Sequence, residues 1–164
     1  MDDLGRIDDA RDEFQRAYEH QMAGRLDEAI EGYQRSIAAH PTAEAHTFLG
    51  WAMSFQGRHE DAIAQCKIAI AVDPTFGNPY NDIGAYLMEL GRHDEAPPWL
   101  ERAKAAPRYE PRQFPYFNLA RVYVKQNRLA EAIAELRQAL RIEPRYEIAR
   151  RELMRLQSEL SRRN

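Results

Sequence analysis

The pattern of polar and apolar positions is organised around a six-residue motif that occurs four times in the chain. The motif is a turn residue, an arginine, three variable and mostly polar residues, and an alanine. Its alanines are spaced by 33, 34 and 36 residues, at positions Ala29, Ala62, Ala96 and Ala132. A period near 34 residues is typical of repeat arrays, in which each unit buries its apolar face against its neighbours. The pattern therefore predicts an all-α solenoid.

Each unit is predicted to hold two antiparallel helices joined at the first residue of the motif. That residue is Gly24, Gly57, Gly91 or Asn127, and glycine and asparagine suit the left-handed conformation that ends many helices. The acidic residues that follow suit the first turn of the second helix, where they complement the helix dipole. The alanines are expected where the two helices cross, because a larger side chain would push the helices apart.

The C-terminal segment has an amphipathic pattern of its own. Ala149, Leu153, Leu156 and Leu160 fall at positions i, i+4, i+7 and i+11, which is one face of a helix. We expect this helix to cover the apolar side of the last repeat. The alternative is a docking helix for a partner.

The third unit departs from the pattern. Pro97 and Pro98 follow its alanine directly, so the second helix is expected to begin late, with Pro97 in its first turn, or to kink there. Further prolines at 107, 111 and 115 predict a stiff, extended segment, here called the proline connector (residues 107–115). It is either a tolerated insertion or an added wall for a binding groove.

The repeated residues resemble those of the tetratricopeptide repeat (TPR) family. The fourth unit fits the family pattern best, through Tyr116, Leu119, Ala120, Tyr123, Ala132, Leu136, Ala139 and Pro144. The resemblance implies a single domain over residues 1–164, a right-handed α-solenoid of four helix-turn-helix repeats with a C-terminal capping helix. The expected repeats are about 10–42, 43–76, 77–112 and 113–145, and the capping helix is about 146–161.

Composition narrows the functional classes. The single cysteine, Cys66, excludes a disulfide within the chain, and the acidic start predicts no secretory signal. No apolar run approaches the roughly 20 residues of a membrane span, so we expect a cytoplasmic protein. The net charge of −3 does not suggest nucleic acid binding. Residues 1–31 are strongly acidic and residues 137–164 are basic, which is compatible with either solvated ends or weak head-to-tail homo-oligomers.

The family resemblance places the binding surface on the first helices of the repeats, which line the concave face. The implied groove is aromatic in its N-terminal half and basic or polar in its C-terminal half, which suits an extended or helical segment with apolar side chains and an acidic residue. Thr47, Asp82 and Glu89 belong to the same surface. The predicted partner-binding residues are Phe14, Tyr18, Phe48, Trp51, Phe55, Asn78, Asn81, Met88, Phe114, Phe117, Asn118, Arg121 and Lys125.

Asn81 and Asn118 have side-chain amides that could hold a peptide backbone. The carboxylate clamp known in the family needs lysine, asparagine and arginine at set positions. Starting from the first unit, those positions hold Phe14, Tyr18, Phe48, Asn78 and Asp82; starting from the second, they hold Thr47, Trp51, Asp82, Phe114 and Asn118. Neither set is a clamp.

The pattern contains no catalytic motif. It has no glycine-rich phosphate loop and no nucleophile elbow. His59 and His93 occupy the same repeat position, so repetition explains them better than metal ligation does. Cys66 stands where the family packs an aromatic residue, which predicts a buried, inert thiol. We therefore expect no enzyme activity, no cofactor and no metal.

The sequence predicts a protein-interaction scaffold or adaptor that binds a partner segment in its concave groove. Two alternatives stay open. The first is a scaffold that assembles with itself through the acidic first repeat and the basic last helix. The second is an export-type chaperone that keeps an unfolded client soluble.

Overall fold

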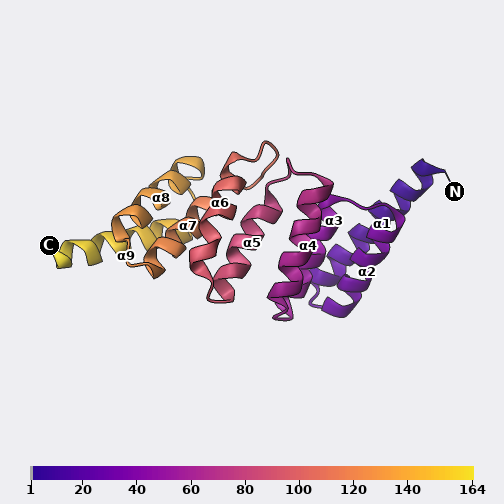
Figure 1. The fold of residues 1–164 in the computed structure, drawn as a ribbon, viewed down its shortest axis with the longest axis horizontal. Coiled ribbons are helices and arrows are strands. Elements are labelled where there is room, and N and C mark those ends of the chain that lie inside the picture. The colour runs from indigo at the N-terminus through magenta and orange to yellow at the C-terminus, as the bar shows by residue number, and fades with distance from the viewer. Residues whose placement is uncertain (1) are drawn as a thin grey trace.

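The computed structural model of the protein describes residues 2–164, and these residues fold into helices without a β-strand. Consecutive helices pack against each other along the chain, so the molecule is an elongated stack with its termini at opposite ends (Figure 1). The prediction of an all-α solenoid is confirmed. The helices are α1 (Asp3–Met22), α2 (Leu26–Ala39), α3 (Ala43–Phe55), α4 (His59–Val72), α5 (Asn78–Glu89), the single 3-10 turn η1 (His93–Glu95), α6 (Ala96–Ala105), α7 (Phe114–Lys125), α8 (Leu129–Ile142) and α9 (Glu147–Arg163).

The turns between paired helices have the predicted left-handed geometry. The φ angles are 77° at Gly24, 76° at Gly57, 74° at Gly91 and 59° at Asn127. The amide of Arg128 donates a hydrogen bond to the carbonyl of Tyr123, at 2.8 Å, and equivalent bonds close the other three turns. These bonds satisfy carbonyls at the helix end that would otherwise lack partners.

The core runs along the stack between the two helices of each pair. The four repeated alanines, Ala29, Ala62, Ala96 and Ala132, are fully buried, as the crossing of the helices requires. One apolar cluster extends from α1 to α7, and a second joins α7, α8 and α9. Each unit therefore depends on its neighbours for burial.

The third unit contains the predicted late helix start. The chain turns once in η1, and α6 then begins at Ala96 with Pro97 and Pro98 in its first turn. Proline is tolerated there because the first amides of a helix have no intrahelical acceptor. As a result α6 has 10 residues, whereas α2, α4 and α8 have 14 each.

The two ends of the stack are finished differently. At the C-terminus, α9 packs on α8, with Ala149 and Leu156 fully buried and Leu153 and Leu160 partly buried. The predicted amphipathic face is thus confirmed. At the N-terminus, α1 begins at Asp3, earlier than the expected start of the first repeat, because the Asp2 carboxylate caps the amide of Gly5 at 2.8 Å.

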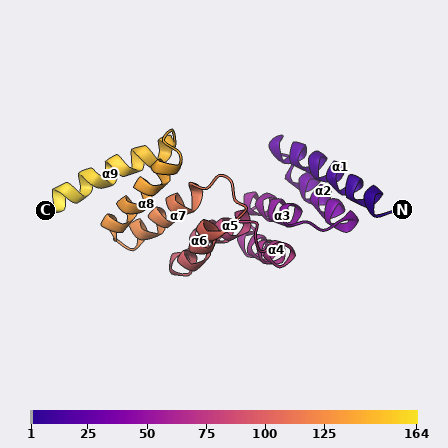
Figure 2. The same ribbon diagram turned by 90° about the horizontal axis from the view of Figure 1, so that it is seen from above.

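Seen from above, the stack is bent (Figure 2). Helices α1, α3 and α7 lie toward the inner side of the bend, and α4 and α6 lie toward the outer side. The segment between α6 and α7 rises on the inner side as well. This arrangement brings α1, α3, α7 and the proline connector onto one face.

Candidate functional site

Five aromatic side chains form a row on α1 and α3, which we call the aromatic row. The Phe48 ring lies with its centroid 5.1 Å from that of Phe14 and 6.0 Å from that of Tyr18. The Trp51 centroid continues the row, 5.6 Å from Phe48 and 5.5 Å from Phe55. Phe55 is 60% exposed and Tyr18 36%, so the row keeps apolar surface in contact with solvent. Aromatic rings held in this way are suited to act as binding anchors.

A cavity of about 250 Å³ adjoins the aromatic row at the centre of the molecule, and we call it the central cavity. Three units of the solenoid and the proline connector contribute to its lining. The lining residues are Thr47, Phe48 and Trp51 of α3, Asn78, Asn81 and Asp82 of α5, Tyr109 and Pro111 of the connector, and Phe114 at the start of α7. The predicted extended segment of residues 107–115 ends earlier than expected, because Phe114 and Pro115 already form the first turn of α7.

Asp82 is the one formally charged residue among those that line the central cavity. Its carboxylate is half-buried and forms no ion pair within residues 2–164. Burial raises the pKa of this carboxyl to about 7, and a side-chain hydrogen bond from Asn81 opposes the rise. An unpaired carboxylate in a partly buried position is costly, because the charge loses hydration without gaining a counter-ion.

The titratable groups that face Asp82 are neutral near pH 7. They are Cys66 of α4, Tyr86 of α5 itself and Tyr109 of the proline connector. Burial raises the pKa of each, and the charge of Asp82 adds to the rise. Cys66 is fully buried, as the sequence predicted.

Two asparagines of the predicted groove bond to each other. The Asn118 amide donates to the side-chain oxygen of Asn81 at 2.9 Å, and both residues are buried. The Asn118 oxygen in turn accepts from Arg121 at 3.2 Å. Asn81 lines the central cavity and Asn118 does not, so only Asn81 is placed to meet a ligand there.

The proline connector is pinned against the loop that precedes α5. Arg108 and the residues around Phe76 exchange backbone hydrogen bonds, from Gly77 N to Arg108 O at 2.9 Å and from Arg108 N to Thr75 O at 3.1 Å. The Arg108 guanidinium bonds Glu44 and Asp73, each at 2.7 Å. These contacts hold Tyr109, which is 3% exposed, as a fixed wall of the central cavity.

The remaining predicted residues lie outside the central cavity. Met88, Arg121 and Lys125 line a separate hollow of about 350 Å³, where Arg121 lies 3.7 Å from the carboxylate of Glu89. Phe117 packs on Tyr146, with ring centroids 5.3 Å apart. The predicted set is therefore spread over several hollows of one face. Its members that meet in the central cavity are Phe48, Trp51, Asn78, Asn81 and Phe114.

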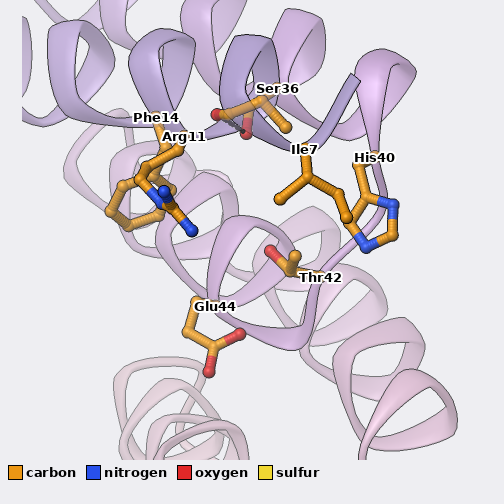
Figure 3. A pocket seen from close by; sticks show the side chains of 8 residues that line it. Ile7, Arg11, Phe14, Ser36, His40, Thr42 and Glu44 are labelled. Atoms are coloured by element: carbon orange, nitrogen blue, oxygen red, sulfur yellow. Dashed lines mark hydrogen bonds between the residues drawn. The ribbon is translucent and has the colours of Figure 1, made fainter. Parts of the chain in front are cut away.

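A larger cavity of about 460 Å³ lies under the N-terminal half of α1 (Figure 3). Ile7 and Phe14 give it apolar walls, and Ser36 is already bonded to the carbonyl of Ala10 at 2.7 Å. Its charged side chains have partners, since Arg11 pairs with Asp8 and Glu44 pairs with Arg108. The larger cavity thus lacks the unpaired charge that marks the central one.

Tyr109 and Pro111 were not among the predicted binding residues. The prolines of the connector indicated an extended segment and left open whether it forms a wall. The hydrogen bonds from Arg108 to α3 and to the loop before α5 hold the connector in place as a wall of the cavity. Such long-range contacts have no local signal in the sequence.

Neither a metal-ligand cluster nor a membrane-spanning helix occurs among residues 2–164. Within residues 2–164, no group of three or more His, Cys, Asp or Glu side chains is arranged to hold a metal ion. None of the described helices combines the length and the apolar character needed to cross a membrane.

Comparison with known proteins places the chain in a family. The tetratricopeptide repeat pattern matches residues 16–75, 56–111 and 114–146. Small glutamine-rich tetratricopeptide repeat-containing protein 2 of Mycosarcoma maydis is 37% identical over 70 residues, which are 42% of this chain and 20% of that protein. The chain therefore spans about a fifth of the length of this relative.

Solved structures share the fold. Pseudomonas aeruginosa pilF superposes with a TM-score of 0.89 at 21% identity, over 96% of this chain and 72% of that one. The second TPR of Spaghetti (RPAP3), bound to the HSP90 peptide SRMEEVD, superposes with a TM-score of 0.60 at 25% identity, over 63% of this chain and 96% of that one. The chain belongs to the tetratricopeptide repeat family.

Proposed function

We propose that this protein is a non-catalytic scaffold that binds a segment of a partner protein along its concave face, over the aromatic row and the central cavity. The main support for this proposal is that the aromatic row and the central cavity lie side by side and share Phe48 and Trp51. Partly exposed aromatic rings lie beside a hollow that three units and the proline connector build together. Rigid aromatic anchors beside a pocket are what binding hot spots require.

Family membership supports this role, because tetratricopeptide repeat proteins are generally non-catalytic scaffolds. The related Spaghetti domain is described with a peptide bound. We expect this protein to bind a different class of peptide from the one bound to the Spaghetti domain. The clamp positions counted from the first unit hold Phe14, Tyr18, Phe48, Asn78 and Asp82, which supply no cation for a carboxylate.

Selection from a displayed library of random linear peptides tests the proposal. Wild-type protein is expected to enrich a family of peptides with apolar residues, and Trp51→Ala should weaken those peptides at least about tenfold because a hot-spot aromatic is lost. Ile68→Ala is the matched control, since Ile68 is an exposed apolar residue of α4, a helix that lies toward the outer side of the bend. Equal loss in both variants, or none in Trp51→Ala, would contradict groove binding.

A further inference from the structure

We propose that the central cavity is a subsite for one arginine side chain of the bound segment, with Asp82 as the counter-ion and the surrounding rings as stacking surfaces. This inference rests on the proposed function and adds the chemistry of the ligand. It differs from the sequence expectation, which called for an acidic residue in the partner.

The size of the cavity suits a side chain. Small-molecule sites in proteins enclose roughly 300–1,000 Å³, and the central cavity has about 250 Å³. The cavity is smaller than that range and has room for one long side chain that enters from a segment lying on the aromatic row. The backbone of that segment would then stay on the open face.

The charge of the cavity selects a cation. Asp82 has no counter-ion among residues 2–164, and the arginines of the neighbouring elements have partners of their own. Arg121 approaches Glu89 and bonds Asn118, and Arg112 donates to the backbone carbonyls of Ala106 and Pro107. A guest cation would therefore supply the ion pair that the folded chain leaves open.

A second acceptor is also unsatisfied. The side-chain oxygen of Asn78, another lining residue, is buried without a hydrogen-bond partner among the described residues. Its amide nitrogen is already used, donating to the carbonyl of Glu110 at 3.4 Å. A buried acceptor left unpaired costs about 1–3 kcal/mol, which a guest donor would recover.

The walls favour arginine over lysine. Phe48, Trp51, Tyr109 and Phe114 line the cavity, and cations are attracted to aromatic faces. A guanidinium is planar, is more weakly hydrated than an ammonium, and carries five donors that can reach a carboxylate and a second acceptor together. Lysine offers one point charge and loses more hydration on entry.

The test uses N-acetyl-argininamide as the probe and NMR shifts of the Trp51 indole N–H as the readout. The neutral isostere N-acetyl-citrullinamide is the comparison ligand. Wild-type protein should bind the arginine probe and not the citrulline probe. The affinity should rise about tenfold between pH 6 and pH 8, as Asp82 ionises. Asp82→Asn should abolish the preference and the pH dependence. Glu31→Gln, which neutralises an exposed carboxylate on α2 away from the cavity, should keep both.

Equal binding of the arginine and citrulline probes, or an unchanged preference in Asp82→Asn, overturns the proposal. N-acetyl-lysinamide is a third probe, and an affinity for it that matches or exceeds that for the arginine probe also overturns the proposal. The peptide selection separates this failure from that of the proposed function. Groove-binding peptides that lack a fixed arginine would leave the scaffold role intact and exclude the arginine subsite. If no peptide is selected, the probe titration still decides the chemistry of the cavity.

Discussion

At the scale of single residues, the unpaired carboxylate of Asp82 has a measurable effect on stability. Its pKa is about 7 in the folded protein and near 3.9 in an unfolded chain. The folded state therefore holds a proton that the unfolded state releases, and the contribution of Asp82 to stability falls as pH rises from about 4 to 7.

Asp82→Asn is thus expected to raise the free energy of unfolding at pH 8 and to leave it unchanged near pH 4. The gain is at most about 4 kcal/mol and is reduced by solvent screening, because the carboxylate is only partly buried. Urea denaturation of both proteins across this range measures the difference. Asp73 has the opposite pH dependence, because hydrogen bonds from Thr75 and Arg108 lower its pKa to about 2. Both proteins contain Asp73, so its contribution cancels in the difference between wild type and variant. A variant less stable than wild type at pH 8 would contradict the assignment.

The turn residues give a second prediction at this scale. Gly57 has a φ of 76° and no atom lies within 4 Å of an added Cβ, so Gly57→Ala isolates the backbone cost. We expect a loss of about 1–2 kcal/mol. Asn127→Gly, at the equivalent position, should change stability by no more than about 0.5 kcal/mol, because both residues tolerate this conformation. Urea denaturation measures both, and an unaffected Gly57→Ala protein would be inconsistent with the geometry.

At the scale of elements, much of the fold was predictable because its determinants are local and repeated. The left-handed turns at Gly24 and Gly57 and the late start of α6 at Pro97 follow from the residues that occupy those positions. The position of the proline connector was not predictable. It depends on the bonds of Arg108 to Glu44 and on the packing of Tyr109, which join segments far apart in the sequence.

The close contact between the connector and Gly77 gives a test. Gly77 has an ordinary φ of −82°, but an added Cβ would lie 2.5 Å from the Cβ of Tyr109 and 2.9 Å from that of Ala106. Gly77→Ala should displace the connector, cost about 1–3 kcal/mol, and speed hydrogen exchange at the Arg108 amide.

The double variant Gly77→Ala, Tyr109→Gly is the control for that prediction. Because glycine at position 109 removes the Cβ that the new methyl group would meet, the loss of stability in the double variant should be smaller than the sum of the two single losses. Additive losses would show that the connector does not press on Gly77.

At the scale of the whole molecule, the stack should lose stability from its ends. Leu156→Ala removes a fully buried side chain from α9, and we expect a cost of about 2–5 kcal/mol. Because each unit contacts only its neighbours, hydrogen exchange should accelerate in α8 and α9 and stay unchanged in α1 and α2. Met154→Ala, at a 64% exposed position of the same helix, is the control. Uniform acceleration along the chain would argue against a modular stack.

Self-association remains the alternative at this scale. Several charges of the terminal helices pair within their own helix, as Arg11 does with Asp8 in α1 and Arg155 with Glu152 in α9. These pairs reduce the charge that each end presents. Sedimentation at about 0.05 M and about 0.5 M salt distinguishes the cases, since oligomers held by the charged ends should dissociate at the higher ionic strength.

The most direct test of groove binding is an NMR map of backbone amide shifts on titration with a library-selected peptide. We expect shifts in α3, α5, the proline connector and the start of α7, centred on Trp51 and Asp82. Shifts confined to α2, α4 and α8, or to α9, would place the binding surface elsewhere and contradict binding in the concave groove.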